Sequence, residues 1–542
     1  MGGLALDADT LGSRSVAIGY TALSGQNFTT ATDSNNTAVG FQAGVNVTTG
    51  TANTLIGSEA GDALTAAFEN VAIGFEAQTT DTLGRRTVAV GNGALQSQNF
   101  TTATNSYNIA VGYDAGTSVT TGDANTLIGG LAGDALTTGG ANTAVGKSAF
   151  SANTGAFSNT AIGHRTLENF NVTTATSTYN VTMGCDAGRQ MTTGIRNTLI
   201  GGLSGDALTD ADYNTVVGMQ ALTSDTLGSK STAIGYSTLN NQNFTTATDS
   251  FNVAVGYEAG TALTTGIQNT FIGAFAGDSL LTSNNNVLVG YAAGNAITTG
   301  ASNTFIGSLV GDGTDDGSAN VAIGQGTLRA NCGDDNCAVG TNALELCTGT
   351  NNTGLGTAAG AGVTSGINNM VLGHDAGRTG SPGGNITTGN NIIALGDENI
   401  GACHIQTDWT IASDQRDKTD FTALDVGLDF VKALNPVTYK WDKRSKYGDK
   451  KADDYDLDAQ TPDGTHKEDW LDVGFKAQEV EVLEKAAGYK IADKTNLVTS
   501  LSNDGKQYGM QYNKFVPILV KAIQELSAKN DALEARIATL EG

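Results

Sequence analysis

Asn53-Thr-Leu-Ile-Gly57 and Asn70-Val-Ala-Ile-Gly74 are two copies of the short motif that decides the fold of this chain. Each copy places an asparagine before three mostly apolar residues and ends on a glycine. Copies begin at residues 36, 53, 70 and 87, so the motif recurs every 17 residues. A fixed period of this length is typical of a solenoid, in which each repeat is one coil that stacks on the next.

A longer period lies over the first part of the repeat region. The step from residue 87 to the next copy at residue 108 is 21 residues, because it holds the insert Gln98-Asn-Phe-Thr-Thr-Ala-Thr104. Similar inserts occupy residues 26–32, 170–176 and 242–248, so units that begin at 36, 108, 180 and 252 are 72 residues apart. The insert predicts either a row of protruding loops, where binding sites commonly lie, or a filler of an edge or interface.

The spacing within one unit predicts two short strands and two tight turns per coil. Glycine supplies the positive φ angles that tight turns need. Asparagine at one fixed position can bond to the asparagine of the coil above and below, and the β-branched residues are expected to stack in a thin core. A helix is excluded because glycine and threonine are too frequent.

Coils this thin bury little apolar surface in one chain, which favours the association of several chains along the rod. The unit, as at residues 15–19 and 320–324, resembles the head repeat of YadA-type trimeric adhesins over most of residues 15–395. That resemblance implies a left-handed parallel β-roll with three rolls side by side. An interwoven triple β-helix is the alternative.

The composition of the chain limits the classes of partner that it can bind. Of 542 residues, 72 are glycine, and the net charge is −25. An acidic, lysine-poor repeat region argues against nucleic acid as a partner, since phosphate contacts need Lys and Arg, and it argues against anionic membrane surfaces. The sequence shows neither a signal peptide nor an apolar run of about 18 residues, so we expect no membrane insertion and synthesis in a cytosol without export.

No metal or cofactor site is expected from the sequence. The acidic turn at residues 312–317 departs from the EF-hand pattern, and Cys332 and Cys337 lack a second ligand pair for zinc. The chain has five cysteines, and an odd number in a chain of this length does not indicate a fold held together by disulfides.

The composition changes at Ser413: 19 of the 29 lysines and arginines follow in the last 130 residues. There we predict a helix over 422–434, a strand over 437–441 and another helix after 472–480. The last segment carries an apolar stripe at 3-4 spacing around Asn530, which predicts a short coiled coil with a register-fixing polar residue. A single amphipathic helix packed on its own domain is the alternative. The stripe consists of Val516, Leu519, Ile523, Leu526, Leu533, Ile537 and Leu540.

Four ordered motifs, at residues 413–418, 434–441, 474–480 and 523–526, resemble the self-cleaving intramolecular chaperone domain of phage tail fibres and endosialidases. The resemblance covers residues 413–542. It implies that the domain trimerises the fibre, drives its folding and then cuts itself off. It further implies Ser413 as nucleophile, Lys418 as general base, and the bond between Ala412 and Ser413 as the one that is cut.

These observations predict a mainly β trimeric rod followed by a small α+β chaperone domain. We expect an N-terminal segment at 1–14, repeats at 15–395, a junction at 396–412 and the chaperone at 413–542. The function expected is that of a phage virion fibre or spike made in host cytoplasm, a homotrimer that binds a host cell-surface glycan or protein receptor and other virion tail proteins. Enzyme activity is expected only as a single self-directed cut. The alternatives are a trimeric bacterial surface adhesin and a tailspike that degrades host glycan.

Overall fold

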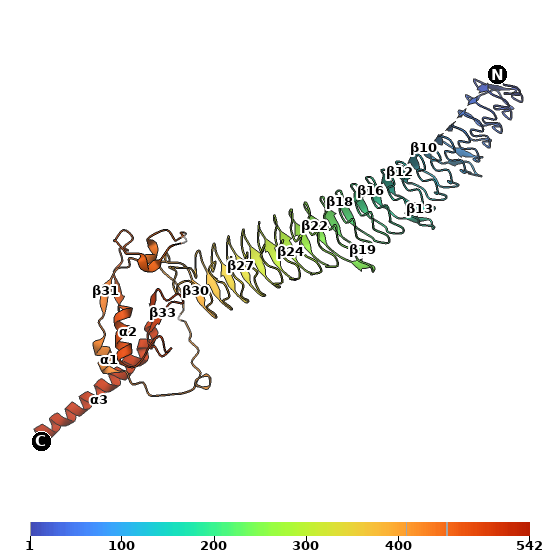
Figure 1. Cartoon of the computed structure of the whole chain (residues 1–542). Coiled ribbons are helices and arrows are strands. Elements are labelled where there is room, and N and C mark those ends of the chain that lie inside the picture. Colours follow the sequence, from blue (N-terminus) through green and yellow to red (C-terminus); the bar gives the residue numbers. More distant parts are fainter. Residues whose placement is uncertain (1, 408, 451, 453) are drawn as a thin grey trace. The chain divides into compact units, whose positions relative to one another are not determined.

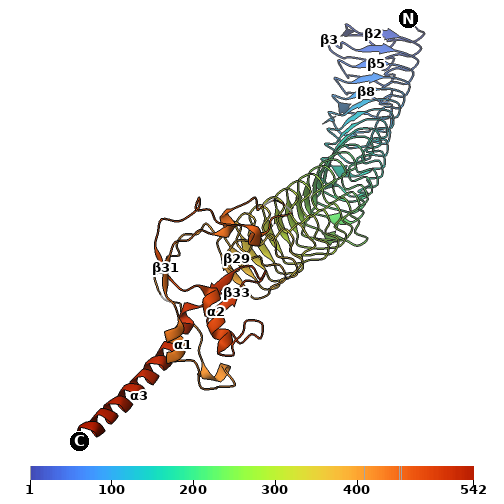
Figure 2. The ribbon, with the colours of Figure 1, turned by 60° about the vertical axis from the view of Figure 1, so that its left-hand side comes forward.

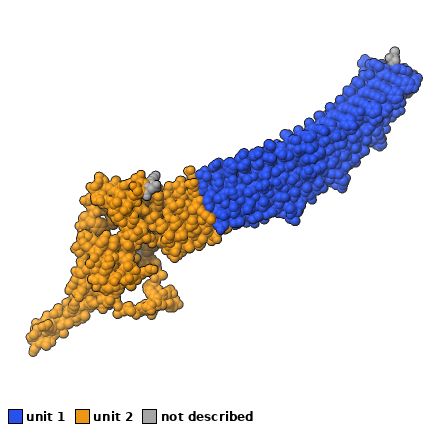
Figure 3. Space-filling model, viewed as in Figure 1, with its two compact units in different colours: residues 1–317 blue, residues 318–542 orange. Residues whose placement is uncertain are grey.

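The computed structural model describes residues 2–407, 409–450, 452 and 454–542. It divides the chain into two compact units, residues 1–317 and 318–542, which are coloured separately in Figure 3. The predicted fold class, a mainly β chain built on a repetitive parallel architecture, is confirmed.

The first unit is a parallel β-solenoid in which each coil contributes one three-residue strand to a common sheet. Figure 1 shows these strands following one another along the unit. Neighbours pair in register, so that Thr54 lies opposite Val71 and Ile56 opposite Ile73. The strands are β2 (Val16–Ile18), β4 (Thr37–Val39), β5 (Thr54–Ile56), β6 (Val71–Ile73), β8 (Val88–Val90), β10 (Ile109–Val111), β11 (Thr126–Ile128), β12 (Thr143–Val145), β14 (Thr160–Ile162), β16 (Val181–Met183), β17 (Thr198–Ile200), β18 (Thr215–Val217), β20 (Thr232–Ile234), β22 (Val253–Val255), β23 (Thr270–Ile272), β24 (Val287–Val289) and β25 (Thr304–Ile306).

Each coil stacks on the next coil of the same chain, as the 17-residue offset between β5 and β6 shows. The single-chain roll is therefore the architecture, and the interwoven triple helix is not. The expectation of two strands per coil is wrong, because the second half of an ordinary coil consists of turns. Residues there alternate into the left-handed region, with φ of 61° at Glu59 and 56° at Gly61, which a strand cannot accommodate.

The four inserts add a second, smaller set of strands. Each insert buries its phenylalanine, as Phe100 shows, and leaves the following Thr101 and Thr102 exposed. The insert is thus a core filler at its phenylalanine and an exposed loop at its threonines. Its parallel pairs are β1 (Gly12–Ser13) with β3 (Thr32–Asp33), β7 (Gly84–Arg85) with β9 (Thr104–Asn105), β13 (Ala156–Phe157) with β15 (Thr176–Ser177), and β19 (Gly228–Ser229) with β21 (Thr248–Asp249).

The predicted asparagine ladder is present. The backbone N–H of Asn53 donates to Asn36 Oδ1 at 2.9 Å, and that of Asn70 donates to Asn53 Oδ1 at 3.1 Å. Asn53 Nδ2 also donates to the carbonyl of Ala67 at 3.0 Å, within its own coil. Each asparagine therefore closes one coil and bonds it to the next, so that buried polar groups are satisfied.

The glycine that ends each motif stands where no side chain fits. Gly57 has φ of 139°, and a Cβ there would lie 2.2 Å from the carbonyl oxygen of Gly74 in the next coil. The close stacking of coils therefore depends on this position.

The core holds only part of the β-branched residues that were expected there, among them Val47 and Val119. In each three-residue strand of the solenoid sheet the middle residue is buried, as Leu55 and Ala72 are. Flanking residues such as Val16 and Ile56 are exposed. The reason is that side chains alternate between the two faces of a strand. The flanking apolar residues therefore form an apolar outer face of the sheet.

The second unit begins with five further coils. Their strands are β26 (Val321–Ile323), β27 (Cys337–Val339), β28 (Thr353–Leu355), β29 (Met370–Leu372) and β30 (Ile393–Leu395), and they pair in the same parallel register.

A small α+β module follows the coils of this unit. Its elements are η1 (Gln415–Asp417), α1 (Leu428–Ala433), β31 (Val437–Tyr439), η2 (Arg444–Lys446), η3 (Leu457–Ala459), β32 (Asp472–Gly474), α2 (Ala477–Ala486), β33 (Thr499–Leu501), β34 (Tyr508–Met510), η4 (Tyr512–Lys514) and α3 (Phe515–Glu541). The helix predicted over 422–434 begins only after Gly427, and the strand predicted over 437–441 ends at Tyr439. Figure 2 shows the end of α3 leaving the rest of the module.

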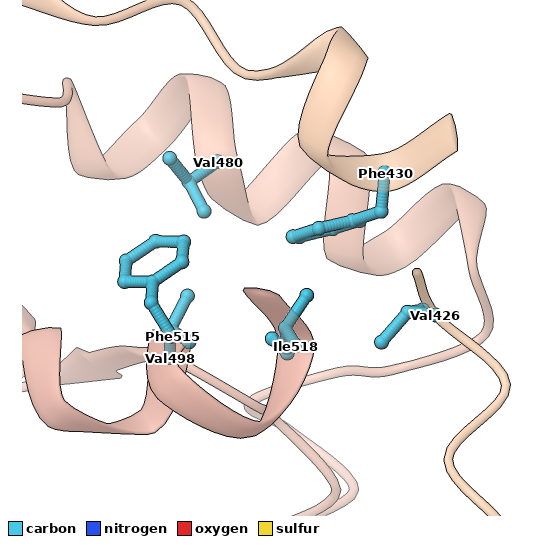
Figure 4. Packing of buried hydrophobic residues seen from close by; sticks show 6 residues of the cluster. All are labelled: Val426, Phe430, Val480, Val498, Phe515 and Ile518. Carbon is cyan, nitrogen blue, oxygen red and sulfur yellow. The ribbon is translucent and has the colours of Figure 1, made fainter. Parts of the chain in front are cut away.

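The module has its own apolar core where α1, α2 and the start of α3 meet (Figure 4). The six buried residues are Val426, Phe430, Val480, Val498, Phe515 and Ile518. This core holds the first turns of α3 and leaves the rest of that helix without cover from its own chain.

Candidate functional site

The hexapeptide at residues 413–418 folds into one tight turn around η1. Asp414 caps this 3₁₀ turn by accepting a hydrogen bond from Arg416 N at 2.9 Å. The backbone N–H of Lys418 donates to the carbonyl of Gln415 at 3.2 Å, which closes the turn. The turn brings the two ends of the hexapeptide together, because Lys418 Nζ donates to Ser413 Oγ at 2.5 Å.

The charges around this turn are paired locally. Arg416 Nη2 lies 2.6 Å from Asp414 Oδ2. The Arg416 guanidinium holds the pKa of the Asp414 carboxyl below its usual value. Asp414 is thus paired with Arg416, and Lys418 donates to the serine hydroxyl.

Ala412, Ser413 and Lys418 are all exposed. A lysine serves as a general base when burial or neighbouring cations lower its pKa. The described residues of this chain supply no such cover, so the turn brings Ser413 and Lys418 together but leaves both side chains open to solvent.

The module also holds the last coils of its own unit. The backbone N–H of Asn385 donates to Asp504 Oδ2 at 3.0 Å, and that of Asn503 donates to the carbonyl of Gly383 at 3.2 Å. Lys443 Nζ donates to the carbonyl of Glu398 at 2.9 Å. These contacts satisfy polar groups where the stack of coils ends.

Among the described residues, two of the exposed apolar surfaces are extended, and they lie on different elements. The predicted stripe on α3 is exposed along its length, from Val516 at 59 % to Leu540 at 79 %. The face of α3 that packs on its own module instead uses Phe515, Ile518 and Ala522. The residues of the stripe therefore do not pack into the module's own core.

The second exposed surface is the outer face of the solenoid sheet. Val16, Ile18 and Ile56 are among the apolar residues that this face exposes. These residues were expected in the core, so this face was not predicted. The order apolar, small, apolar in copies such as Val16-Ala-Ile18 and Val71-Ala-Ile73 was the signal that could have found it.

None of the described helices combines the length and the apolar character needed to cross a lipid bilayer.

Comparison with known proteins assigns a family likeness to part of the second unit. Residues 413–489 match the family model described as the chaperone of endosialidase. No curated protein and no solved structure matches the chain. The C-terminal module is therefore similar to an intramolecular chaperone, and that similarity begins at Ser413.

Proposed function

We propose that this chain is a phage virion fibre or spike protein that trimerises through its C-terminal module and then cuts itself between Ala412 and Ser413. The observation that carries the proposal is the pairing of Lys418 with Ser413 at the first residue of the chaperone-like segment. The solenoid is the lasting part of the molecule, and its role is attachment to a host surface.

The exposed apolar surfaces support a homotrimer. A stripe at 3-4 spacing on a 27-residue helix, interrupted once by Asn530, is the pattern of a coiled coil whose register is fixed by one polar residue. The outer face of the solenoid sheet provides a second surface that a partner chain would cover. Both surfaces run over many coils or turns, as association along a rod requires.

A temporary trimeriser solves a problem that the repeats create. Coils of nearly equal sequence can slip by one 17-residue unit at little cost, and unpaired strand edges stay exposed until the chains are aligned. A coiled coil at one end fixes the alignment. Removal of the module after folding then leaves the rod separated from the unfolded state by a kinetic barrier.

The proposed cut is a transfer of the Ala412 acyl group followed by hydrolysis. Neutral Lys418 takes the proton from Ser413 Oγ, and Oγ attacks the carbonyl carbon of Ala412. The bond from that carbon to Ser413 N breaks as the nitrogen takes the proton back from Lys418. Water then hydrolyses the resulting ester, which leaves a carboxylate on Ala412 and restores the Ser413 hydroxyl beside its new amino group.

Assembly would switch this chemistry on. The turn at 413–418 is exposed in the single chain, and covering it with partner chains would favour the neutral form of Lys418 that the first step needs. Cleavage would then follow trimer formation.

The attachment surface is proposed to include the insert loops. They recur every 72 residues and expose threonines such as Thr101 and Thr102. Hydroxyl groups repeated along a rigid scaffold suit a repetitive glycan or protein receptor on a cell surface.

Mass spectrometry of the purified wild-type chain and of Ser413→Ala and Lys418→Arg variants tests the mechanism. Wild type should give fragments that end at Ala412 and begin at Ser413. Both variants should assemble but cut at least about 100-fold more slowly, since alanine has no nucleophile and arginine cannot give up its proton. Lys440→Arg, at another exposed lysine, is the matched control and should cut normally. Normal cutting by Ser413→Ala would refute the mechanism.

A further inference from the structure

Coil stacking brings together three side chains of different chemistry in the first unit: His164, Cys185 and Asp186. Strands β14 and β16 pair in register, with Ile162 opposite Met183. His164 and Cys185 each follow the glycine after those strands, so they occupy the same position in successive coils.

The distances between their donor atoms are short. His164 Nδ1 lies 3.9 Å from Cys185 Sγ, and Cys185 Sγ lies 3.6 Å from Asp186 Oδ2. All three donor atoms lie within 4.8 Å of one another. A tetrahedral Zn²⁺ with bonds of about 2.0–2.3 Å sets its ligand atoms about 3.3–3.6 Å apart. Shifts of a few tenths of an ångström for the first two pairs and a rotation of the imidazole or carboxylate for the third would complete that geometry.

The donor set selects the kind of ion. Imidazole nitrogen and thiolate sulfur are ligands of zinc and similar transition metals, whereas Ca²⁺ and Mg²⁺ take oxygen ligands. Three protein ligands leave a fourth position for water, as in open zinc sites.

One oxygen of the Asp186 carboxylate has no hydrogen-bond partner among the described residues. Asp186 is only 9 % exposed, and its Oδ1 is buried with no hydrogen-bond partner. Arg165 Nη2 lies 2.8 Å from Oδ2 and holds the carboxylate in place. A bound cation would give Oδ1 the partner that it lacks.

The 72-residue repeat shows that this combination is specific to one place. The positions equivalent to His164 and Cys185 hold Tyr20 and Phe41 in the first copy and Tyr236 and Tyr257 in the last. Those aromatic pairs stack, with ring centroids 5.8 Å and 5.3 Å apart. The third copy has metal-ligand side chains where these two copies have stacked rings.

We infer that His164, Cys185 and Asp186 form a Zn²⁺ site that links two neighbouring coils of the solenoid. The sequence analysis expected no metal, because His164 and Cys185 are 21 residues apart and do not form a local motif. The site lies before residue 413, so it does not depend on whether the chain cuts itself.

The test is zinc binding by the full chain after treatment with a chelator and dialysis. Elemental analysis should find about one Zn²⁺ per chain after zinc is added back, and Co²⁺ should give the sulfur-to-cobalt charge-transfer band of a thiolate ligand. Cys185→Ser and His164→Tyr should each weaken zinc binding at least about 100-fold and remove that band. His164→Tyr introduces the residue of the first and last copies, so its circular dichroism should match that of wild type.

Cys337→Ser is the matched control, since Cys337 is also an exposed free cysteine on the solenoid. It should bind zinc as wild type does. The inference is overturned if wild type retains no zinc at micromolar concentrations, if the Cys185→Ser and His164→Tyr variants retain it unchanged, or if Cys337→Ser loses it equally.

Discussion

At the scale of the residue, the candidate site depends on a local turn, and the solenoid depends on its asparagines. The Ser413–Lys418 pair needs only the Asp414 cap and one 3₁₀ turn. Asn36 and Asn53 each close a coil and bond it to its neighbour. The contact between Ser413 and Lys418 and the ladder of asparagines could be predicted, because each depends on side-chain chemistry at a fixed spacing.

Two half-buried carboxylates of the repeat, those of Asp134 and Asp278, predict an unusual response of stability to pH. Burial raises the pKa of Asp134 and Asp278 above the ordinary 3.8, and each has a buried Oδ1 without a partner. The folded state therefore binds protons more tightly than the unfolded state, so these groups oppose folding at pH 7 and cease to do so as the pH falls through their folded pKa values.

A double variant, Asp134→Asn with Asp278→Asn, should therefore unfold at a higher temperature than wild type at pH 7. The difference should shrink as the pH is lowered toward 4. Scanning calorimetry of both proteins between pH 4 and 7.5 checks this. A difference that grows at low pH would show that the two carboxylates stabilise the fold when charged.

At the scale of the element, each coil is limited by its glycine. Gly57→Ala would place a Cβ 2.2 Å from the Gly74 carbonyl oxygen at a φ of 139°, and it should destabilise the solenoid by at least about 2–3 kcal/mol. Gly130→Ala is the control, because the nearest atom to its Cβ would be 3.9 Å away. Chemical denaturation of both variants should show a large loss for the first and little change for the second; equal losses would contradict the stacking argument.

Helix α3 gives the second prediction at this scale. Leu526→Asp with Leu533→Asp places charges in the proposed coiled-coil core and should weaken trimer association at least about 100-fold. Ala528→Asp puts the same charge on an exposed position away from the stripe and should leave the trimer intact. Analytical ultracentrifugation distinguishes the two. A trimer that survives the double variant would mean that α3 does not hold the chains together.

Prediction from sequence succeeded for elements with a period and failed where tertiary packing decides. The 17-residue repeat and the stripe on α3 could be predicted because spacing alone reveals them. The absence of a second strand in an ordinary coil could not be predicted, because it depends on left-handed residues such as Glu59 that turn the chain there. The core was misassigned for a related reason: the outward side chains of Val16 and Ile18 look like core residues until the strand's two faces are separated.

The juxtaposition of His164 with Cys185 lay beyond a linear search, since it arises from stacking across a 21-residue coil. The hexapeptide differs, because both reactive groups lie within six residues and one turn unites them. Sequence reasoning therefore reaches sites made by local structure more readily than sites made by register.

At the scale of the whole molecule, the proposed trimer assembly comes first and the proposed cut between Ala412 and Ser413 follows it. A chain with repeated coils needs a fixed register before it folds, and a module that supplies the register is no longer needed afterwards. In the proposed mechanism the exposed Ser413–Lys418 turn sets the order of events, since it would need cover before Lys418 could act as a base. The account therefore rests on assembly preceding the cut.

Native mass spectrometry of the full chain, sampled from the start of refolding until cleavage is complete, tests this order most directly. The account predicts that trimers of intact 542-residue chains appear first, and that fragments 1–412 and 413–542 arise only from those trimers. Cleaved chains that appear as monomers before any trimer has formed would contradict it.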